Sequence, residues 1–352
     1  MRRRGPPNGT SGAAPALALV LLALGPVACG SPRPPAGQVP HRDLGKVEAV
    51  DFHGWPAMAL RNGHTEVVVV PAIGRVMSLG FAGDAGASDP LWRHGQLGPG
   101  LAPDENGWIN FGGDKAWPAP QSEWERMAGK GWPPPATFDA QPHAASATPS
   151  RIETVSAVDQ AYGLRVRRAV SLLDDQMLID TTYEKVSGPS VRVAVWTITQ
   201  LVSPERVFAL LPERSSFAGG HRSLLPAPPK DLRVDGRLLA ISRDTREKTM
   251  IANDADALLW VGPGRDLVIE NISRPTDTES SAPRPGGAHA QIYTSPDGAE
   301  PYVELELLGP LVDLVPGQRT SMSVRYRLVR RQNPDALEEA RRIFAAELSG
   351  HR

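Results

Sequence analysis

Residues 56–74 read PAMALRNGHTEVVVVPAIG, in which two runs of apolar and β-branched residues flank Asn62 and Gly63. An Asn-Gly pair favours a tight turn between antiparallel strands, because both residues tolerate positive φ angles. The segment therefore predicts a β-hairpin, and it sets the fold class that the rest of the chain has to match.

Further runs with a period of two follow the hairpin as far as Arg330, separated by turn-forming residues. They are RIETVSAV (151–158), LRVRRAVSLL (164–173), QMLIDTTYEKV (176–186), VRVAVWTITQL (191–201), RVFALL (206–211), RLLAIS (237–242), ALLWVG (257–262), DLVIENI (266–272), AQIYTS (290–295), PYVELELLG (301–309) and TSMSVRYRLV (320–329). So many short strands predict that residues 46–330 form one all-β domain, a large antiparallel sandwich or barrel.

The C-terminal residues, 331–352, have a helical pattern instead. Asn333 and Pro334 are suited to the N-cap and first position of a helix. An apolar face follows, made of Leu337, Ala340, Ile343, Phe344 and Leu348. We expect one helix here, packed on the β domain.

The N-terminus, residues 1–28, has the pattern of an export signal: arginines, an apolar run and a small residue at its end. Ala13–Ala28 spans 16 residues, which is short for a bilayer-spanning helix. Pro26–Cys29 resembles a bacterial lipobox, whose cysteine is diacylated after cleavage. A Pro/Gly-rich tether follows in residues 29–45. We expect an exported cell-envelope lipoprotein held to a membrane through Cys29, with plain secretion or an uncleaved anchor as alternatives.

The composition excludes several functions. The chain has 38 basic and 39 acidic residues and no run of like charge, so no basic patch for nucleic acid is expected. The sequence has no phosphate-binding glycine loop, no zinc-type His/Cys cluster and no Gly-x-Ser-x-Gly motif. We therefore expect no cofactor and no metal, and the sequence leaves the protein partners unknown.

Residues 108–135, WINFGGDKAWPAPQSEWERMAGKGWPPP, hold four of the eight tryptophans, at 108, 117, 124 and 132, together with five prolines. Proline fixes φ and lacks an N–H donor, so we expect neither a regular helix nor a central strand. The pattern is typical of a long, rigid functional loop. Gly112 and Gly113 would let its backbone turn or approach another group closely.

Five segments resemble the bacterial family known as domain of unknown function 4380. They are residues 66–81, 110–124, 131–143, 195–201 and 302–318. That family is similar to the galactose-mutarotase-like superfamily, which implies a β-supersandwich and a sugar-binding cleft. In the superfamily's mutarotases a glutamate takes the anomeric hydroxyl proton and a histidine protonates the ring oxygen.

The late strand, residues 302–307, offers carboxylates for this chemistry. Alternation places Tyr302, Glu304 and Glu306 on one face. Two neighbouring carboxylates raise each other's pKa, which suits a general base, so Glu304 and Glu306 are the candidate catalytic residues. The competing interpretation is the water-exposed face of a sheet.

The candidate acid is harder to find, because the strand at 195–200 has no histidine. Trp196 and Gln200 share one face of that strand and are candidate ligand contacts. His94 and His143, in loops, are possible substitutes for the acid, although an isolated loop histidine is usually a solvated bystander.

Residues 108–135 contain the two kinds of side chain that bind sugars, aromatic rings and hydrogen-bonding groups. Trp117, Trp124 and Trp132 offer aromatic faces for C–H patches, and the candidate hydrogen-bonding residues are Asn110, Asp114, Lys115 and Gln121. We expect Trp117 and Lys115 to contact ligand, and Trp55 and Trp260 to be structural. Alternatively, the tryptophans form a satellite hydrophobic cluster.

Three functions therefore stay open. The first is a carbohydrate-active protein with epimerase-type proton transfer, and the second is a non-catalytic glycan-binding lipoprotein. The third is an envelope scaffold that uses the tryptophan-rich loop for protein contact.

Overall fold

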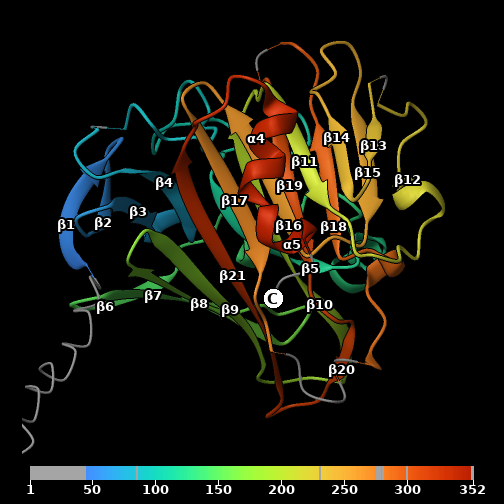
Figure 1. Ribbon diagram of the computed structural model, residues 1–352. Coiled ribbons are helices and arrows are strands. Elements are labelled where there is room, and N and C mark those ends of the chain that lie inside the picture. The colour runs from blue at the N-terminus through green and yellow to red at the C-terminus, as the bar shows by residue number, and fades with distance from the viewer. Residues whose placement is uncertain are drawn as a thin grey trace, which may run out of the picture. The chain divides into compact units, whose positions relative to one another are not determined.

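The computed structural model describes residues 45–349 except 85, 230, 275–278, 280 and 299. The predicted signal peptide and Cys29 lie outside the described residues. Within residues 45–349, two large β-sheets carry most of the chain (Figure 1), and all strand pairs among the described residues are antiparallel. The predicted all-β fold class is confirmed.

The hairpin in residues 56–74 forms as predicted, from β2 (Trp55–Arg61) and β3 (Thr65–Val70). Its turn is closed by Asn62, whose side-chain Oδ1 accepts the backbone N–H groups of His64 and Thr65 at 2.9 and 2.8 Å. The Asn side chain thus replaces part of the backbone hydrogen bonding that the turn interrupts.

The first sheet has 11 strands, ten of them in the order β1-β2-β3-β4-β5-β10-β19-β18-β15-β12, with β20 also paired to β10. Besides the hairpin, its strands are β1 (Lys46–Phe52), β4 (Arg75–Phe81), β5 (Asp114–Ala119), β10 (Val191–Val202), β12 (Arg222–Ser223), β15 (Thr249–Asn253), β18 (Ala290–Thr294), β19 (Tyr302–Leu308) and β20 (Val312–Leu314).

The second sheet has ten strands in the order β13-β14-β11-β16-β17-β21-β9-β8-β7-β6. They are β6 (Ala144–Thr148), β7 (Arg151–Val158), β8 (Leu164–Leu173), β9 (Gln176–Lys185), β11 (Arg206–Leu210), β13 (Arg233–Asp235), β14 (Leu238–Ile241), β16 (Ala257–Gly262), β17 (Arg265–Asn271) and β21 (Arg319–Arg330). One hydrophobic core combines side chains from both sheets, such as Ile198 and Leu305 from the first with Val166 and Val324 from the second.

The expectation that residues 108–135 contain no central strand is wrong. β5 lies inside the first sheet, between β4 and β10, and it includes Pro118. The proline is tolerated because β4 pairs with β5 only at Asp114, so beyond that residue β10 is the only partner. Proline is accepted where one side of a strand has no neighbour.

After β5 the segment forms two short helices, η2 (Gln121–Glu123) and α1 (Trp124–Ala128), and α2 (Ala136–Asp139) follows the segment. Gly112 and Gly113 have φ angles of 89° and 73°. A Cβ on Gly112 would lie 2.2 Å from the carbonyl oxygen of Trp92. The close approach predicted for these glycines is therefore made to the protein's own backbone.

The remaining single-turn 3-10 helices are η1 (Pro71–Ile73), η3 (Ala218–Gly220) and η4 (Pro285–Gly287).

The C-terminal helix is present as α4 (Ala336–Ile343) and α5 (Ala345–Leu348), which are separated at Phe344. Its predicted apolar face packs on the outer side of the second sheet, against residues of β11, β14, β16 and β17 (Figure 1). The N-cap is Asp335 rather than Asn333, because the Asp335 carboxylate accepts the N–H groups of Leu337 and Glu338. No helix in the described part of the chain is long and apolar enough to cross a membrane.

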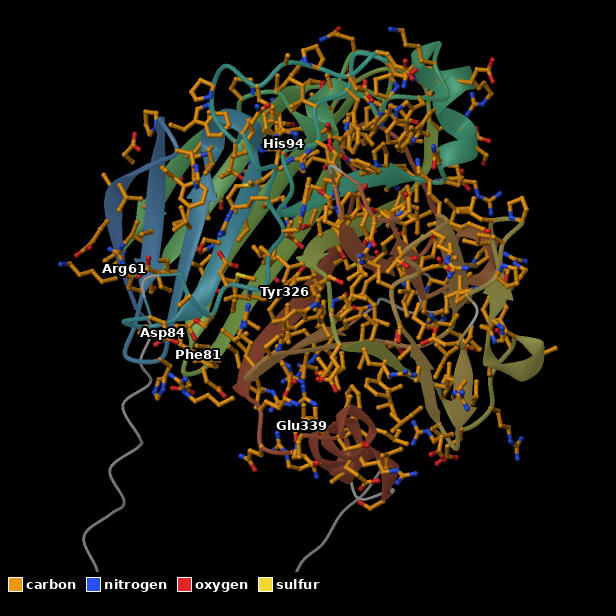
Figure 2. The ribbon with its side chains drawn as sticks, turned by 90° about the horizontal axis from the view of Figure 1, so that it is seen from above. Arg61, Phe81, Asp84, His94, Tyr326 and Glu339 are labelled. Carbon is orange, nitrogen blue, oxygen red and sulfur yellow. The ribbon has the colours of Figure 1, made fainter. Side chains whose placement is uncertain are left out.

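Asp114 joins the two sheets from inside the core. Its carboxylate pairs with Arg168 of β8 and accepts hydrogen bonds from Thr199 of β10 at 2.7 Å and Tyr326 of β21 at 2.6 Å. Figure 2 labels Tyr326 among the side chains between the strands. Asp114 is fully buried, so its charge is stabilised by such protein partners and not by water.

We predict that Asp114→Asn lowers the free energy of unfolding by about 3–5 kcal/mol, because Arg168 would keep a buried charge without its partner. Urea denaturation measures this loss. The control is Glu338→Gln, which removes the exposed pair with Arg341 and should leave the unfolding midpoint nearly unchanged. A loss below about 1 kcal/mol for Asp114→Asn would contradict the role given to this carboxylate.

Candidate functional site

Four neighbouring strands of the first sheet, β5, β10, β19 and β18, bring polar and aromatic side chains onto one face. Across β5 and β10, Trp117 pairs with Trp196. Glu304 of β19 lies between Gln200 of β10 and Tyr293 of β18. Directly paired residues of antiparallel strands point to the same side of the sheet, so strand register alone assembles this group.

Glu304 and Lys115 form an ion pair on this face, with 3.4 Å between the Lys115 Nζ and a Glu304 carboxylate oxygen. Burial raises the pKa of Glu304, and the positive charge of Lys115 opposes part of that rise. Burial likewise lowers the pKa of Lys115, with Glu304 acting in the opposite direction. The Lys115 ammonium also lies 4.9 Å from the ring centre of Trp117. The Glu304 side chain keeps 12% of its surface exposed, although it lines neither of the two hollows described below.

Glu306 is buried more deeply, at 1% exposure. One of its carboxyl oxygens accepts the indole N–H of Trp196 at 2.8 Å. Burial and then the charge of Glu304 raise the pKa of Glu306 well above its ordinary value. The competing interpretation of these glutamates as the wet face of a sheet is therefore wrong, because both are buried.

Arg75 and Asp139 complete the charged group, and neither was predicted from the sequence. An Arg75 guanidinium nitrogen lies 2.5 Å from an Asp139 carboxylate oxygen, which also accepts the indole N–H of Trp117 at 2.9 Å. The other Asp139 oxygen accepts the indole N–H of Trp108 at 3.0 Å. Burial lowers the pKa of Arg75, and the charges of Asp139 and Glu304 raise it. Asp139 thus anchors two tryptophans beside the carboxylate pair.

Five tryptophans form a contiguous cluster over this face, namely Trp108, Trp117, Trp124, Trp132 and Trp196. Trp117 is central to it, with ring centres 5.6 Å from Trp196 and 6.0 Å from Trp132. Trp117 and Trp196 are buried and Trp124 has no exposed surface, whereas Trp132 is 38% exposed. The interior of the cluster is therefore core, and its outer edge is Trp132 with the half-buried Trp108.

Gln200 is fully buried next to Glu304, and neither its amide oxygen nor its amide nitrogen has a hydrogen-bond partner in the described part of the chain. A buried amide without partners costs free energy, and native proteins seldom leave one so without a reason. Its position beneath the site gives it a candidate role in ligand binding or in holding a water molecule.

Two adjoining hollows open beside this face. The first, of about 390 Å³, is lined in part by Trp108, Trp132, Tyr293 and Tyr302. The second, of about 350 Å³, is lined in part by His94 and Asn110. Both hollows share Asp104, Trp108 and Glu300, so these residues form the wall between them. Loops contribute most of this lining, whereas the buried charges come from the strands β4, β5 and β19 and from the short helix α2.

Several predicted site residues lie elsewhere. Asp114 points into the core, on the opposite side of β5 from Lys115, so we leave it out of the candidate site. Gln121 is exposed at the start of η2 and lines neither hollow. Lys115 and Trp117 are buried behind the hollows and do not form their walls.

The two loop histidines lie in different environments. His143 is buried, with its ring against Gly74, and burial lowers its pKa to about 4. His94 lines the second hollow, and its Nε2 lies 3.9 Å from a Glu300 oxygen. The Nδ1 of His94 accepts the backbone N–H of Gln96 at 3.1 Å, which assigns the proton of the neutral ring to Nε2. His94 is thus the histidine available to a ligand.

Among the described residues, no group of three or more His, Cys, Asp and Glu side chains is arranged to hold a metal ion.

Comparison with known proteins identifies the fold. No family model matches the chain, and no curated protein matches it in sequence. A galactose mutarotase-like protein from Lactobacillus casei aligns with a TM-score of 0.52 and 11% identity, over 77% of this chain and 99% of that one. A galactose mutarotase related enzyme from Lactobacillus acidophilus aligns with a TM-score of 0.50 and 10% identity, over 77% and 97%.

A TPR-domain containing protein from Parabacteroides distasonis is also similar, with a TM-score of 0.51 and 14% identity. The match covers 82% of this chain but only 53% of that longer protein. Together these likenesses show that the chain has the galactose-mutarotase-like β-supersandwich fold, as the sequence resemblance predicted.

We predict that Trp117→Ala lowers the free energy of unfolding by about 3–5 kcal/mol, as Trp260→Ala should, because both side chains fill buried space. Trp132→Ala should cost much less, since this side chain is already partly in water. Urea denaturation of the three variants makes the comparison. A smaller loss for Trp117→Ala than for Trp132→Ala would show that Trp117 is not the centre of the cluster.

Proposed function

We propose that this protein binds a carbohydrate in the hollow lined by Trp108, Trp132, Tyr293 and Tyr302. The observation that carries the proposal is the combination of aromatic rings that line this hollow with a buried carboxylate pair on the same sheet face, where Glu304 pairs with Tyr293. Aromatic faces pack against the C–H patches of a pyranose, and carboxylate and amide groups accept hydrogen bonds from its hydroxyls. The names of the similar solved structures agree with this ligand class.

A mutarotase-type proton transfer is the catalytic form of this proposal. Glu304 is the base, because it is the less buried of the two glutamates and its raised pKa brings it nearer to neutral pH. It would take the proton of the anomeric hydroxyl. The candidate acid is His94, which lines the second hollow, so this scheme needs a sugar that extends past the shared wall of Asp104, Trp108 and Glu300. In its imidazolium form His94 would give the Nε2 proton to the ring oxygen, the bond from the anomeric carbon to the ring oxygen would break, and the pyranose ring would open.

Other buried residues hold the two glutamates in place. Lys115 holds the Glu304 carboxylate, and Trp196 holds Glu306. Burial and the charge of Glu304 raise the pKa of Glu306, so of the two carboxyl groups Glu306 is the one that holds its proton more firmly. The charge of Glu304 thus acts on Glu306, and Glu306 in turn accepts the indole N–H of Trp196 beside the site.

A non-catalytic glycan-binding protein is the second candidate. It would use the same hollow without proton transfer. The depth of Glu306 and Gln200 favours it, because neither side chain reaches the hollow in this conformation. The third possibility, a scaffold that contacts proteins through its tryptophans, has less support, since most of the cluster is buried.

We also propose that the protein is an exported lipoprotein anchored through Cys29. The apolar segment before this cysteine and the Pro/Gly-rich residues after it support the proposal. Membership of the family of domain of unknown function 4380 likewise stays a prediction from the sequence.

We predict that Glu304→Gln lowers the rate of anomer interconversion by about 10²–10⁴-fold, because it removes the proton acceptor while keeping its shape. NMR exchange spectroscopy on a panel of aldoses measures the rate, and calorimetry measures sugar binding, after a thermal melt has shown that the variant folds. Glu338→Gln, on the exposed face of α4, is the matched control.

Binding without interconversion in the wild type would establish the non-catalytic candidate. A Glu304→Gln variant that keeps the wild-type interconversion rate would remove Glu304 as the base.

We predict that Cys29→Ser moves the protein from the membrane fraction to the soluble exported fraction, because it removes the acylated thiol. Cell fractionation and the intact mass of the mature wild-type protein test this. Unchanged fractionation, together with a wild-type mass that includes no acyl chains, would contradict the anchor.

A further inference from the structure

The wall between the two hollows is rich in hydrogen-bond acceptors. Asp104 and Glu300 are both in it, beside the indole of Trp108. Asp104 accepts the backbone N–H groups of Asn106 and Trp108, each at 2.9 Å, and the hydrogen bond from Trp108 leads in lowering its pKa. Asp104 is therefore ionised at neutral pH, and it forms no ion pair within 4.0 Å with any described basic residue.

Glu300 has two polar neighbours, Asn110 and His94. One of its oxygens accepts the Nδ2 of Asn110 at 2.8 Å, and the other faces His94 at 3.9 Å. Asn110 is 5% exposed and lines the second hollow, and its Oδ1 has no hydrogen-bond partner among the described residues. The wall thus offers two carboxylates and an amide oxygen that lacks a donor.

Basic side chains do little to balance this charge. Lys248 is exposed at the first hollow, and Arg243 is paired with Asp297, the other carboxylate there. The pKa shifts of the two neighbouring tyrosines also indicate a negative electrostatic potential in this region. Burial, followed by the charge of Glu304 and other carboxylates, raises the pKa of both Tyr293 and Tyr302. The hollows should therefore attract cations and repel anions.

The aromatic lining adds to this preference. Trp108, Trp132, Tyr293 and Tyr302 all contribute to the first hollow. The negative face of an aromatic ring attracts an ammonium group, and tryptophan does so most strongly. Neutral sugars also pack on such rings, so the rings alone do not select a cation. Their combination with Asp104 and Glu300 does.

We propose that the ligand carries a protonated amine, as an amino sugar with a free amino group does, and that Asp104, Glu300 and the face of Trp108 receive its ammonium group. This inference rests on the proposed carbohydrate function and narrows it to a substrate class. Sugars with carboxylate or sulfate groups should bind worst.

The experiment compares two pairs of probes at pH 7, using tryptophan fluorescence and calorimetry. Cyclohexylamine, charged at this pH, is compared with cyclohexanol, and D-glucosamine with D-glucose. The binding is measured on the full chain in its wild-type form and in the variants Glu300→Gln, Asp104→Asn and, as a control, Glu338→Gln. The control residue lies on α4 beside Glu339, at the opposite end of the view from His94 (Figure 2).

We expect each amine to bind at least about tenfold more tightly than its neutral counterpart, in keeping with charge-assisted hydrogen bonds. Glu300→Gln and Asp104→Asn should each reduce that ratio, as should 0.5 M salt, and Glu338→Gln should not. Glu300 and Asp104 are partly or fully solvent-facing, and thermal melts check that the variants fold.

The two proposals fail separately. Equal affinity for amine and neutral probes, no binding of either cyclohexyl compound, or a preference that survives both carboxylate substitutions overturns the amine site. A preference for cyclohexylamine without binding of any sugar supports the amine site and overturns the carbohydrate function.

Discussion

The buried carboxylate of Asp114 is the constraint on which the site depends. It links β5 and β10 of one sheet to β8 and β21 of the other, and it thereby fixes which face of β5 points inward. Because side chains alternate along a strand, Lys115 and Trp117 must then point to the opposite face. There they meet Glu304, Asp139 and the other tryptophans. The polar contact in the core and the candidate site therefore lie on opposite faces of β5.

The candidate site is unusual in how much charge it buries. Arg75, Lys115, Asp139, Glu304 and Glu306 are all below 10% exposure. Replacing a buried ion pair by apolar residues is often neutral or stabilising, so stability alone is a weak reason to keep such a group. Perturbed pKa values beside a hollow are more typical of functional sites. We therefore relate this group to ligand chemistry, and the Asp114 contact to the stability of the sandwich.

Much of the fold could be predicted from local patterns. The Asn62-Gly63 turn, most strands and the apolar face of α4 follow from periodicity, which burial on one side enforces. β5 could not be recognised, because Pro118 argued against a strand and only the absence of a second neighbour makes it acceptable. With β5 unrecognised, Asp114 and Lys115 were both assigned to the ligand, although adjacent strand residues cannot share a face. The inward position of Arg168 could be predicted from the sequence, since Arg168 lies on the same face of its strand as Val166 and Val170.

The contacts of Asp139 and Arg75 could not be predicted, because they join residues 64 positions apart through loops that have no periodic pattern. The same holds for the hollows, whose walls are mostly loop residues. Glu304 and Glu306 could be selected from alternation together with the family resemblance, but their burial depends on how residues 108–143 cover the sheet. The sequence therefore predicted the charged residues on the strands better than the loop residues that line the hollows.

The most direct test of the central claim is a crystal structure of the protein soaked with an aldose or an amino sugar. We predict a sugar ring against Trp108 and Tyr302, within reach of Glu304. The molecule offers a clear alternative, a hollow of about 770 Å³ beside α4 that is lined in part by Phe208, Val234 and Leu337. A sugar bound there, or at any place away from the Trp108 wall, would contradict the account.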